Sequence, residues 1–361
     1  LLAAIVLSFW IVIFIQTVIN LRVVPRLDGN ASPAARPFVS IVVPARNEER
    51  NIARSVRSFL AQDYAHFELI VVNDRSTDRT GDVLRGIGDA RLTIIDGTET
   101  PPGWLGKPWA LEQGAAAAKG EVLLFVDADL IYAPPALRAA IAQLERSNAA
   151  MLALFPHFEV RTLGEQVAMP MLVFFAYCSV PLWCVNRTTS PRLALGGGSG
   201  NMIRRDALTS IGGFTQLQDA VVDDIGLARV VREAKLPTRI VRADDLISVR
   251  MYHSAREVVE GFTKNAFPAT GRSYVMAALI LALIAVVHLF PYVFGWIATM
   301  IVISLTRVVL FRSLRYSMIN AIFFHPLMVA FWAYIFLRSM WFTGVRNQVH
   351  WRGRTYNARV I

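Results

Sequence analysis

The stretch that most constrains the fold is residues 121–130, EVLLFVDADL, in which the apolar run 122–126 is followed at once by Asp127 and Asp129. A short, continuous apolar run predicts a buried strand of a parallel sheet. Ligands of open α/β sheets bind just beyond the carboxyl ends of such strands. Two carboxylates there suit a hard divalent cation that substrate phosphates also hold. Taken alone, however, a D-x-D pattern more often marks a solvated turn, so its interpretation depends on the rest of the chain.

The surrounding chain alternates between strand and helix patterns. Strands are predicted at 38–45, 67–74, 91–96, 121–126 and 150–155, and helices at 47–62, 79–87, 107–119 and 134–146. The first helix has Asn47 as its predicted cap. This spacing implies right-handed βαβ units and a parallel sheet, which we place in an α/β domain over 38–272. No GxGxxG follows the first strand, which argues against a dinucleotide-dependent oxidoreductase.

The N-terminal end is apolar. Residues 1–19 carry no charge and are long enough to span a bilayer. A secretory signal peptide is the alternative, but its apolar region would be unusually long. We therefore expect a membrane anchor over 1–24 and a proline-containing linker over 25–37. The arginines that follow the anchor (Arg22, Arg26 and Arg36) place the α/β domain in the cytoplasm by the positive-inside rule.

The C-terminal end, 273–343, is also apolar. Residues 274–311 predict two crossings with a break near Pro291, and 317–342 form a third apolar segment broken by Pro326. A re-entrant or interfacial hairpin about Pro326 would keep the basic tail, 344–361, in the cytoplasm. The expected protein is a multi-pass protein of a bacterial-type inner membrane.

Composition agrees with a membrane protein. The 361 residues are 54% hydrophobic, with a net charge of +10 and a mean hydropathy of +0.43, which is too apolar for an ordinary soluble enzyme. Because many arginines lie beside apolar segments, the positive charge indicates a membrane surface and no nucleic-acid partner. Cys178 and Cys184 provide neither a disulfide framework nor metal-ligand spacing, so we expect two buried thiols.

Other stretches carry polar or amphipathic patterns. Glycines at 196–200 allow a backbone to approach a ligand closely, although a flexible surface loop is the alternative. Asp223 and Asp224 open an amphipathic helix, where the helix dipole alone would explain an acidic pair. A second amphipathic helix is predicted at 253–267. The apolar segment 165–185 is predicted to lie at the membrane interface or under the sheet.

Several of these stretches together resemble a known family. They read VSIVVPARNEERNI, ELIVVNDRSTDRT, GWLGKPWALEQGAAAAKGEVLLFVDADL, GGGSGNMIRRDAL and VVDDIGLARVV. In order and spacing, over about 38–270, they resemble the family-2 inverting glycosyltransferases with a GT-A fold. The arrangement is similar to that of members that glycosylate lipids, such as carotenoid, hopanoid-associated and ceramide-type enzymes. The resemblance implies a Rossmann-like, mainly parallel mixed sheet, a nucleotide-sugar donor (a UDP-sugar), a lipid acceptor, and Mg²⁺ or Mn²⁺.

The resemblance also assigns roles to single residues. The nucleotide-sugar pocket would be lined by Pro44, Arg46, Glu48, Asp74, Lys107 and Asp127, with Asp74 at the uracil. Asp129 would be the direct metal ligand beside Asp127, and Asp224 the catalytic base. The sugar and acceptor side would be formed by Gly197, Gly198, Ser199, Asp223 and Lys264. The Q/R-x-x-R-W motif of processive and ceramide-type members is missing at 261–265, which favours transfer of a single sugar.

The chemistry of the reaction supports this division of roles. A metal bridging the phosphates to Asp129 would stabilise the leaving diphosphate, and an acceptor hydroxyl needs a carboxylate base on the opposite flank of the sugar. Asp224, from a separate segment, can meet that demand. The alternatives are a processive polysaccharide synthase, an inactive glycosyltransferase-like scaffold, and a transporter. The apolar segments contain few charged or titratable groups that would suit transport: His288, Arg307, His325 and Arg338.

Overall fold

The chain folds into two compact units. The structure is a computed structural model that describes residues 1–220, 222–346, 348–351 and 354–357. One unit is an α/β unit formed by 24–159 and 183–250. The other is a helical unit formed by 1–23, 160–182 and 251 onward. The sequence-based domain 38–272 therefore includes two stretches, 160–182 and 251–272, that the structure groups with the apolar helices.

The α/β unit is built on a seven-stranded sheet with the order β3-β2-β1-β4-β8-β6-β9. Its strands are β1 (Val39–Ala45), β2 (Phe67–Asn73), β3 (Leu92–Asp96), β4 (Val122–Phe125), β6 (Met151–Phe155), β8 (Asn201–Arg204) and β9 (Thr238–Arg242). Neighbouring strands are parallel except where β8 runs antiparallel to both β4 and β6. A small second sheet has the order β5-β10-β7. Its strands are β5 (Leu130–Tyr132), β7 (His157–Phe158) and β10 (Ile247–Val249). The predicted mixed, mainly parallel sheet is confirmed.

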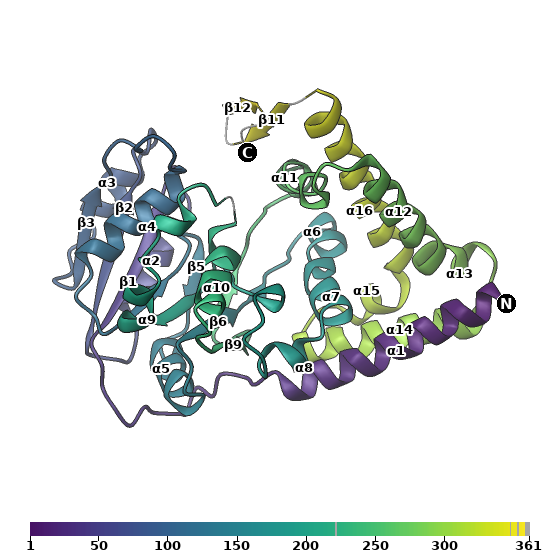
Figure 1. Ribbon diagram of the computed structural model, residues 1–361, viewed down its shortest axis with the longest axis horizontal. Coiled ribbons are helices and arrows are strands. Elements are labelled where there is room, and N and C mark those ends of the chain that lie inside the picture. The colour runs from purple at the N-terminus through teal and green to yellow at the C-terminus, as the bar shows by residue number, and fades with distance from the viewer. Residues whose placement is uncertain (221, 347, 352–353, 358–361) are drawn as a thin grey trace. The chain divides into compact units, whose positions relative to one another are not determined.

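Helices cover both faces of the large sheet (Figure 1). They are α2 (Ile52–Leu60), α3 (Thr80–Arg85), α4 (Gly106–Ala117), α5 (Ala136–Arg146), α9 (Arg205–Ser210) and α10 (Asp223–Glu233). In β4, Leu124 packs into the core shared with α2 and α5, whereas Leu123 and Phe125 pack into the core shared with α4 and α10. Each such fully buried side chain stabilises the unit by about 1.5–3 kcal/mol. This two-sided burial explains why the strand is apolar throughout.

One helix start differs from the prediction. The helix expected from residue 47 begins only at Ile52, after Asn51, and Asn47 does not cap it. Asn47 has a φ of 53°, in the left-handed region, which is incompatible with a helix. Residues 48–51, between Asn47 and the start of α2, lie in the turn region that follows the carboxyl end of β1.

Among the residues that the structure describes, the helical unit contains four helices long and apolar enough to cross a membrane: Leu2–Val23, Tyr274–Val293, Ile297–Leu314 and His325–Val345. Its elements are α1 (Leu2–Val23), α6 (Leu163–Ala168), α7 (Pro170–Ser179), α11 (Ala255–Thr263), α12 (Tyr274–Ile284), α13 (Phe290–Val293), α14 (Ile297–Leu314), α15 (Met318–Phe323), α16 (His325–Ser339), β11 (Gln348–Trp351) and β12 (Arg354–Asn357). A short helix, α8 (Leu182–Val185), lies where the chain passes between the units. Helices α1 and α14 run side by side (Figure 1).

The apolar C-terminal segments break close to the predicted places. The first break lies at Gly295, whose φ is 64°, a few residues after Pro291. The second lies beside Pro326, which occupies the first turn of α16, where proline is tolerated. The helix that follows continues to Val345 and is long enough to cross a bilayer, whereas the sequence predicts a re-entrant or interfacial hairpin about Pro326. The side of the membrane on which the tail lies stays a prediction.

Polar side chains fasten the apolar helices to one another. Asn20 of α1 donates hydrogen bonds of 2.8 Å to the carbonyls of Tyr177 and Val180, so α7 packs on α1. In the same unit, the buried Arg307 donates to the carbonyl of Ala321 at 2.8 Å. Unsatisfied polar groups in lipid cost several kcal/mol, so these bonds favour one fixed helix arrangement. The segment predicted at the interface or under the sheet thus belongs to the helical unit.

Candidate functional site

The site is organised around Lys107, the second residue of α4. Its Nζ lies 2.8 Å from Oδ1 of Asp127 and 3.2 Å from Oδ1 of Asp223. Asp127 is the second residue after strand β4, and Asp223 is the first residue of α10. Three predicted site residues from distant parts of the sequence therefore meet at one point, beyond the carboxyl end of a central strand. Such edges are where open α/β sheets bind ligands.

Burial and charge set the protonation of this cluster. Burial raises the pKa of the Asp223 carboxyl from 3.8 to about 6, against the opposing effect of the Lys107 ammonium. Burial also disfavours the charged form of Lys107, but Asp127 and Asp223 outweigh it and hold its pKa above the ordinary value. Lys107 therefore stays protonated and places a positive charge between two acidic segments.

The glycine loop is fixed in place and is not a flexible surface loop. The carbonyl of Gly198 accepts a hydrogen bond of 2.8 Å from the amide of Asp127. A Cβ on Gly198 would overlap the carboxylate of Asp127, so only glycine leaves this carboxylate uncovered. The hydroxyl of Tyr132 donates to the carbonyl of Ser199 at 2.6 Å, and the Ser199 hydroxyl donates to the carbonyl of Leu154.

The same loop lies against the start of α10. Asn201 donates from Nδ2 to the carbonyl of Asp224 at 3.1 Å, and its Oδ1 accepts from the amide of Gly197 at 3.3 Å. A Cβ on Gly196 would overlap the carbonyl of Asp224. The Asp224 carboxylate is half-buried and caps the amide of Ile225 at 2.8 Å. Asn201 therefore holds the glycine loop against the start of α10. Its sequence context did not indicate this role.

Asp74 directly follows strand β2, which is separated from β4 by β1. Its carboxylate is 5% exposed and accepts hydrogen bonds from Arg46 at 3.1 Å and Arg75 at 3.4 Å. A Cβ on Gly106 would come within 2.9 Å of Asp74, so the N-terminus of α4 lies directly against this carboxylate. Since Lys107 is the next residue, the Asp74 region and the Asp127 region form one continuous site.

Two other predicted nucleotide residues lie at or just after the carboxyl end of β1. Pro44 lies in β1, whose partner β2 ends next to it. The amide of Glu48 donates to Thr80 at 2.8 Å. Two non-glycine residues at this edge have left-handed backbone conformations: Asn47, with a φ of 53°, and Arg75, with a φ of 50°. Backbone strain of this kind concentrates at functional sites, so it supports a binding role for this edge.

The acidic residues are suited to a divalent cation. Asp129 lies half-buried in the turn between β4 and β5, two residues after Asp127. Within the described residues, no three His, Cys, Asp or Glu side chains gather into a closed metal cage. Mg²⁺ in particular is usually held by one or two carboxylates together with substrate phosphates. Asp129 and Asp127, whose carboxylate Gly198 leaves uncovered, offer such a pair. The donor set thus fits a cation that arrives with a nucleotide.

The last predicted site residue, Lys264, lies in the helical unit. It follows directly after α11 and belongs to the helical unit, whereas the other predicted site residues belong to the α/β unit. Its contact with an acceptor stays a prediction.

Comparisons with known proteins agree with this geometry. Residues 40–208 match the model of glycosyl transferase family 2. A 4,4'-diaponeurosporenoate glycosyltransferase of Staphylococcus aureus (strain MRSA252) is 24% identical over 346 residues, which is 88% of each chain. That of Staphylococcus haemolyticus (strain JCSC1435) is 23% identical over 249 residues, 68% of this chain and 65% of that one. Residues 40–208 therefore form a family-2 glycosyltransferase domain.

A solved structure shows the same fold. The mannosyltransferase PcManGT from Pyrobaculum calidifontis, solved in complex with GDP-Man and Mn²⁺, aligns with a TM-score of 0.54 at 19% identity. The alignment covers 94% of this chain and 97% of that one. The glycosyltransferase therefore has a GT-A fold together with apolar helices at both ends.

Proposed function

We propose that this glycosyltransferase moves one sugar from a nucleotide-sugar, a UDP-sugar in the first instance, to a lipid acceptor, with inversion and with a divalent cation. The α/β unit would face the cytoplasm and the apolar helices would hold it at a membrane. The lipid acceptor is supported by the four apolar helices and by the name of the staphylococcal relatives, whose acceptor is a carotenoid.

The observation that carries the proposal is the meeting of Asp127, Lys107 and Asp223. It places the D-x-D segment and the acidic pair of α10 on the two sides of one ammonium group. A donor diphosphate would lie on the D-x-D side and an acceptor on the α10 side. An inert scaffold has no need of three ionised groups at a sheet edge, since burying charge costs free energy unless the charge is used or paired.

Each residue has a defined part in the proposed reaction. A cation held by Asp129 and Asp127 would neutralise charge on the leaving diphosphate as a Lewis acid. Lys107 adds a fixed positive charge beside the same phosphates. Asp224 accepts the proton of an acceptor hydroxyl as that oxygen attacks the anomeric carbon from the opposite side. Arg46 orients Asp74, which contacts the nucleobase.

A second acceptor class is favoured by one specific observation. The ending of "diaponeurosporenoate" denotes a carboxylate, and a carboxylate is already ionised at neutral pH. Such an acceptor would need no base, and Asp224 would then only position it. The two classes make different predictions for the same substitution.

Asp224→Asn separates them. With a hydroxyl acceptor, we expect turnover to fall about 10²–10⁴-fold, the usual contribution of a general base, while donor binding is unchanged. With a carboxylate acceptor, the loss should be far smaller. The assay is single-turnover transfer from labelled donor in membranes. Near-normal turnover with a hydroxyl acceptor would refute the assignment of Asp224 as base.

The activity itself is tested with membranes that contain the full chain. These are incubated with a panel of radiolabelled UDP-sugars, with GDP-mannose included, and the labelled lipid is identified by mass spectrometry. We expect one sugar per lipid. A ladder of products would indicate a processive synthase, and the absence of any transfer or donor hydrolysis would indicate a scaffold.

A further inference from the structure

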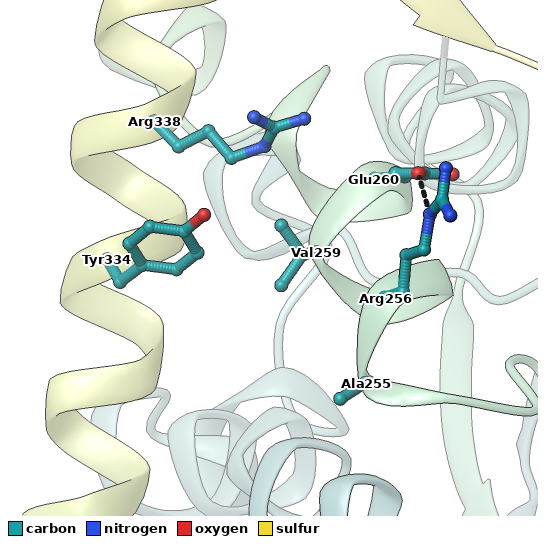
Figure 2. A pocket seen from close by; sticks show the side chains of 6 residues that line it. All are labelled: Ala255, Arg256, Val259, Glu260, Tyr334 and Arg338. Carbon is teal, nitrogen blue, oxygen red and sulfur yellow. Dashed lines mark hydrogen bonds and ion pairs between the residues drawn. The ribbon is translucent and has the colours of Figure 1, made fainter.

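A pocket of about 410 Å³ lies within the helical unit, between α11 and α16. It is lined by Ala255, Arg256, Val259, Glu260, Tyr334 and Arg338. Figure 2 shows Tyr334 and Arg338 extending from α16 toward Val259 of α11. No role in the proposed reaction has been given to any of these side chains.

Arg338 is the distinctive group of this pocket. Its Nε is buried and has no hydrogen-bond partner among the described residues, and its guanidinium lies 4.3 Å from the centre of the Phe342 ring. Arg256, by contrast, donates from Nε to Glu260 at 2.8 Å, on the side of α11 that faces away from α16 (Figure 2). The pocket thus has two positive charges and one negative charge. A buried donor without a partner costs about 1–3 kcal/mol, so Arg338 favours an incoming anion.

The surroundings of the pocket indicate what carries that anion. Arg338 and Tyr334 lie on a helix long enough to cross a membrane, His325–Val345. On the same helix Leu337 and Trp341 are 52% and 51% exposed. Arg338 and Trp341 lie within the last eight residues of this helix, and arginine and tryptophan near the end of an apolar helix mark the water–lipid boundary. A ligand at this place would therefore combine a negatively charged head with an apolar chain.

We propose that this pocket binds the phosphate of an anionic phospholipid, with the Arg338 guanidinium and the Tyr334 hydroxyl as donors. The planar guanidinium matches two phosphate oxygens at once, which a single tyrosine or lysine cannot do. Val259 lines the pocket beside the first methylenes of the lipid chain. Anionic lipids are concentrated at cytoplasmic membrane surfaces, and the basic chain attracts them. This inference does not depend on which sugar or acceptor the enzyme uses.

Native mass spectrometry of the full chain in detergent tests the proposal. The protein is mixed with equal amounts of phosphatidylglycerol and the zwitterionic phosphatidylcholine, and the retained ratio of the two lipids is measured. Arg338→Gln should lower that ratio about tenfold, the usual effect of one hydrogen bond to a charged group. The control is Arg22→Gln, at the exposed end of α1 and outside the pocket, which should change the ratio little.

Two milder variants keep the test decisive if Arg338→Gln does not fold. Arg338→Lys keeps the charge but loses the paired donors, so it should give an intermediate ratio. Tyr334→Phe removes only the hydroxyl and should lower the ratio by less than Arg338→Gln. Equal losses in the Arg338 and Arg22 variants would show general charge attraction and overturn the proposal. In a second mixture, of oleate and phosphatidylglycerol, preferential retention of oleate would overturn it as well, since it would show a carboxylate site.

Discussion

Asp223 should make the enzyme less stable at neutral pH than a neutral residue at the same position would. Burial raises the pKa of this carboxyl from 3.8 to about 6. At 1.36 kcal/mol for each pH unit, this difference corresponds to about 3 kcal/mol. Because the pKa is raised on folding, the stabilising contribution is fully present below pH 3.8 and is lost as the pH rises through about 6.

Asp223→Asn removes the ionisation while keeping the shape of the side chain. At pH 7.5 we expect the variant to be more stable than the wild type by up to about 3 kcal/mol. At pH 4, close to the ordinary pKa, the difference should have fallen to about 0.5 kcal/mol. For a unit of about 200 residues, each kcal/mol corresponds to about 2–4 °C, so the unfolding temperature should rise by about 6–12 °C at pH 7.5.

The assay is thermal unfolding of the purified full chain in detergent, followed by tryptophan fluorescence between pH 4 and 8. EDTA is present throughout so that no cation contributes. Asp219→Asn, on an exposed carboxyl a few residues earlier, is the control and should show no pH-dependent difference. A variant that is less stable than the wild type at pH 7.5, or a difference that does not change with pH, would refute this account of Asp223.

Two further predictions concern the donor side. Gly198→Ala places a methyl group on the carboxylate of Asp127, so nucleotide-sugar turnover should fall at least tenfold; Gly88→Ala, with open space around it, should leave turnover unchanged. Asp129→Ala should abolish cation-dependent binding of UDP measured by calorimetry, and EDTA should have the same effect on the wild type. UDP binding that is indifferent to both treatments would contradict a metal role for Asp129.

The strands of the α/β unit were predictable because each is a short apolar run buried on both faces. The run 122–126 led to β4, and the aspartates after it lie at the sheet edge as expected. The antiparallel strand β8 was not recognised. Its four residues, NMIR, carry no alternation that distinguishes a strand from a loop, and its pairing with β4 and β6 is a long-range choice.

The candidate site was predictable in its residues but not in its connections. Motif spacing pointed to Asp127, Lys107 and Asp223 separately. Their ion pairs depend on where α4 and α10 begin relative to β4, which no local pattern encodes. Asn201 was missed for a similar reason, since its two hydrogen bonds reach Gly197 and Asp224. The turn at Asn47 was mistaken for a helix cap because asparagine favours both caps and left-handed backbones.

The α/β unit is formed by two separate stretches of the chain, 24–159 and 183–250, and this affects its folding during synthesis. Strand β8, which lies between β4 and β6 in the sheet, is synthesised only after the apolar residues 160–182, so β4 emerges from the ribosome with one edge open. An open strand edge invites pairing with other chains. A fragment ending at 159 should therefore aggregate, and a soluble version for crystallisation would need 24–159 spliced to 183–250 through a short polar linker.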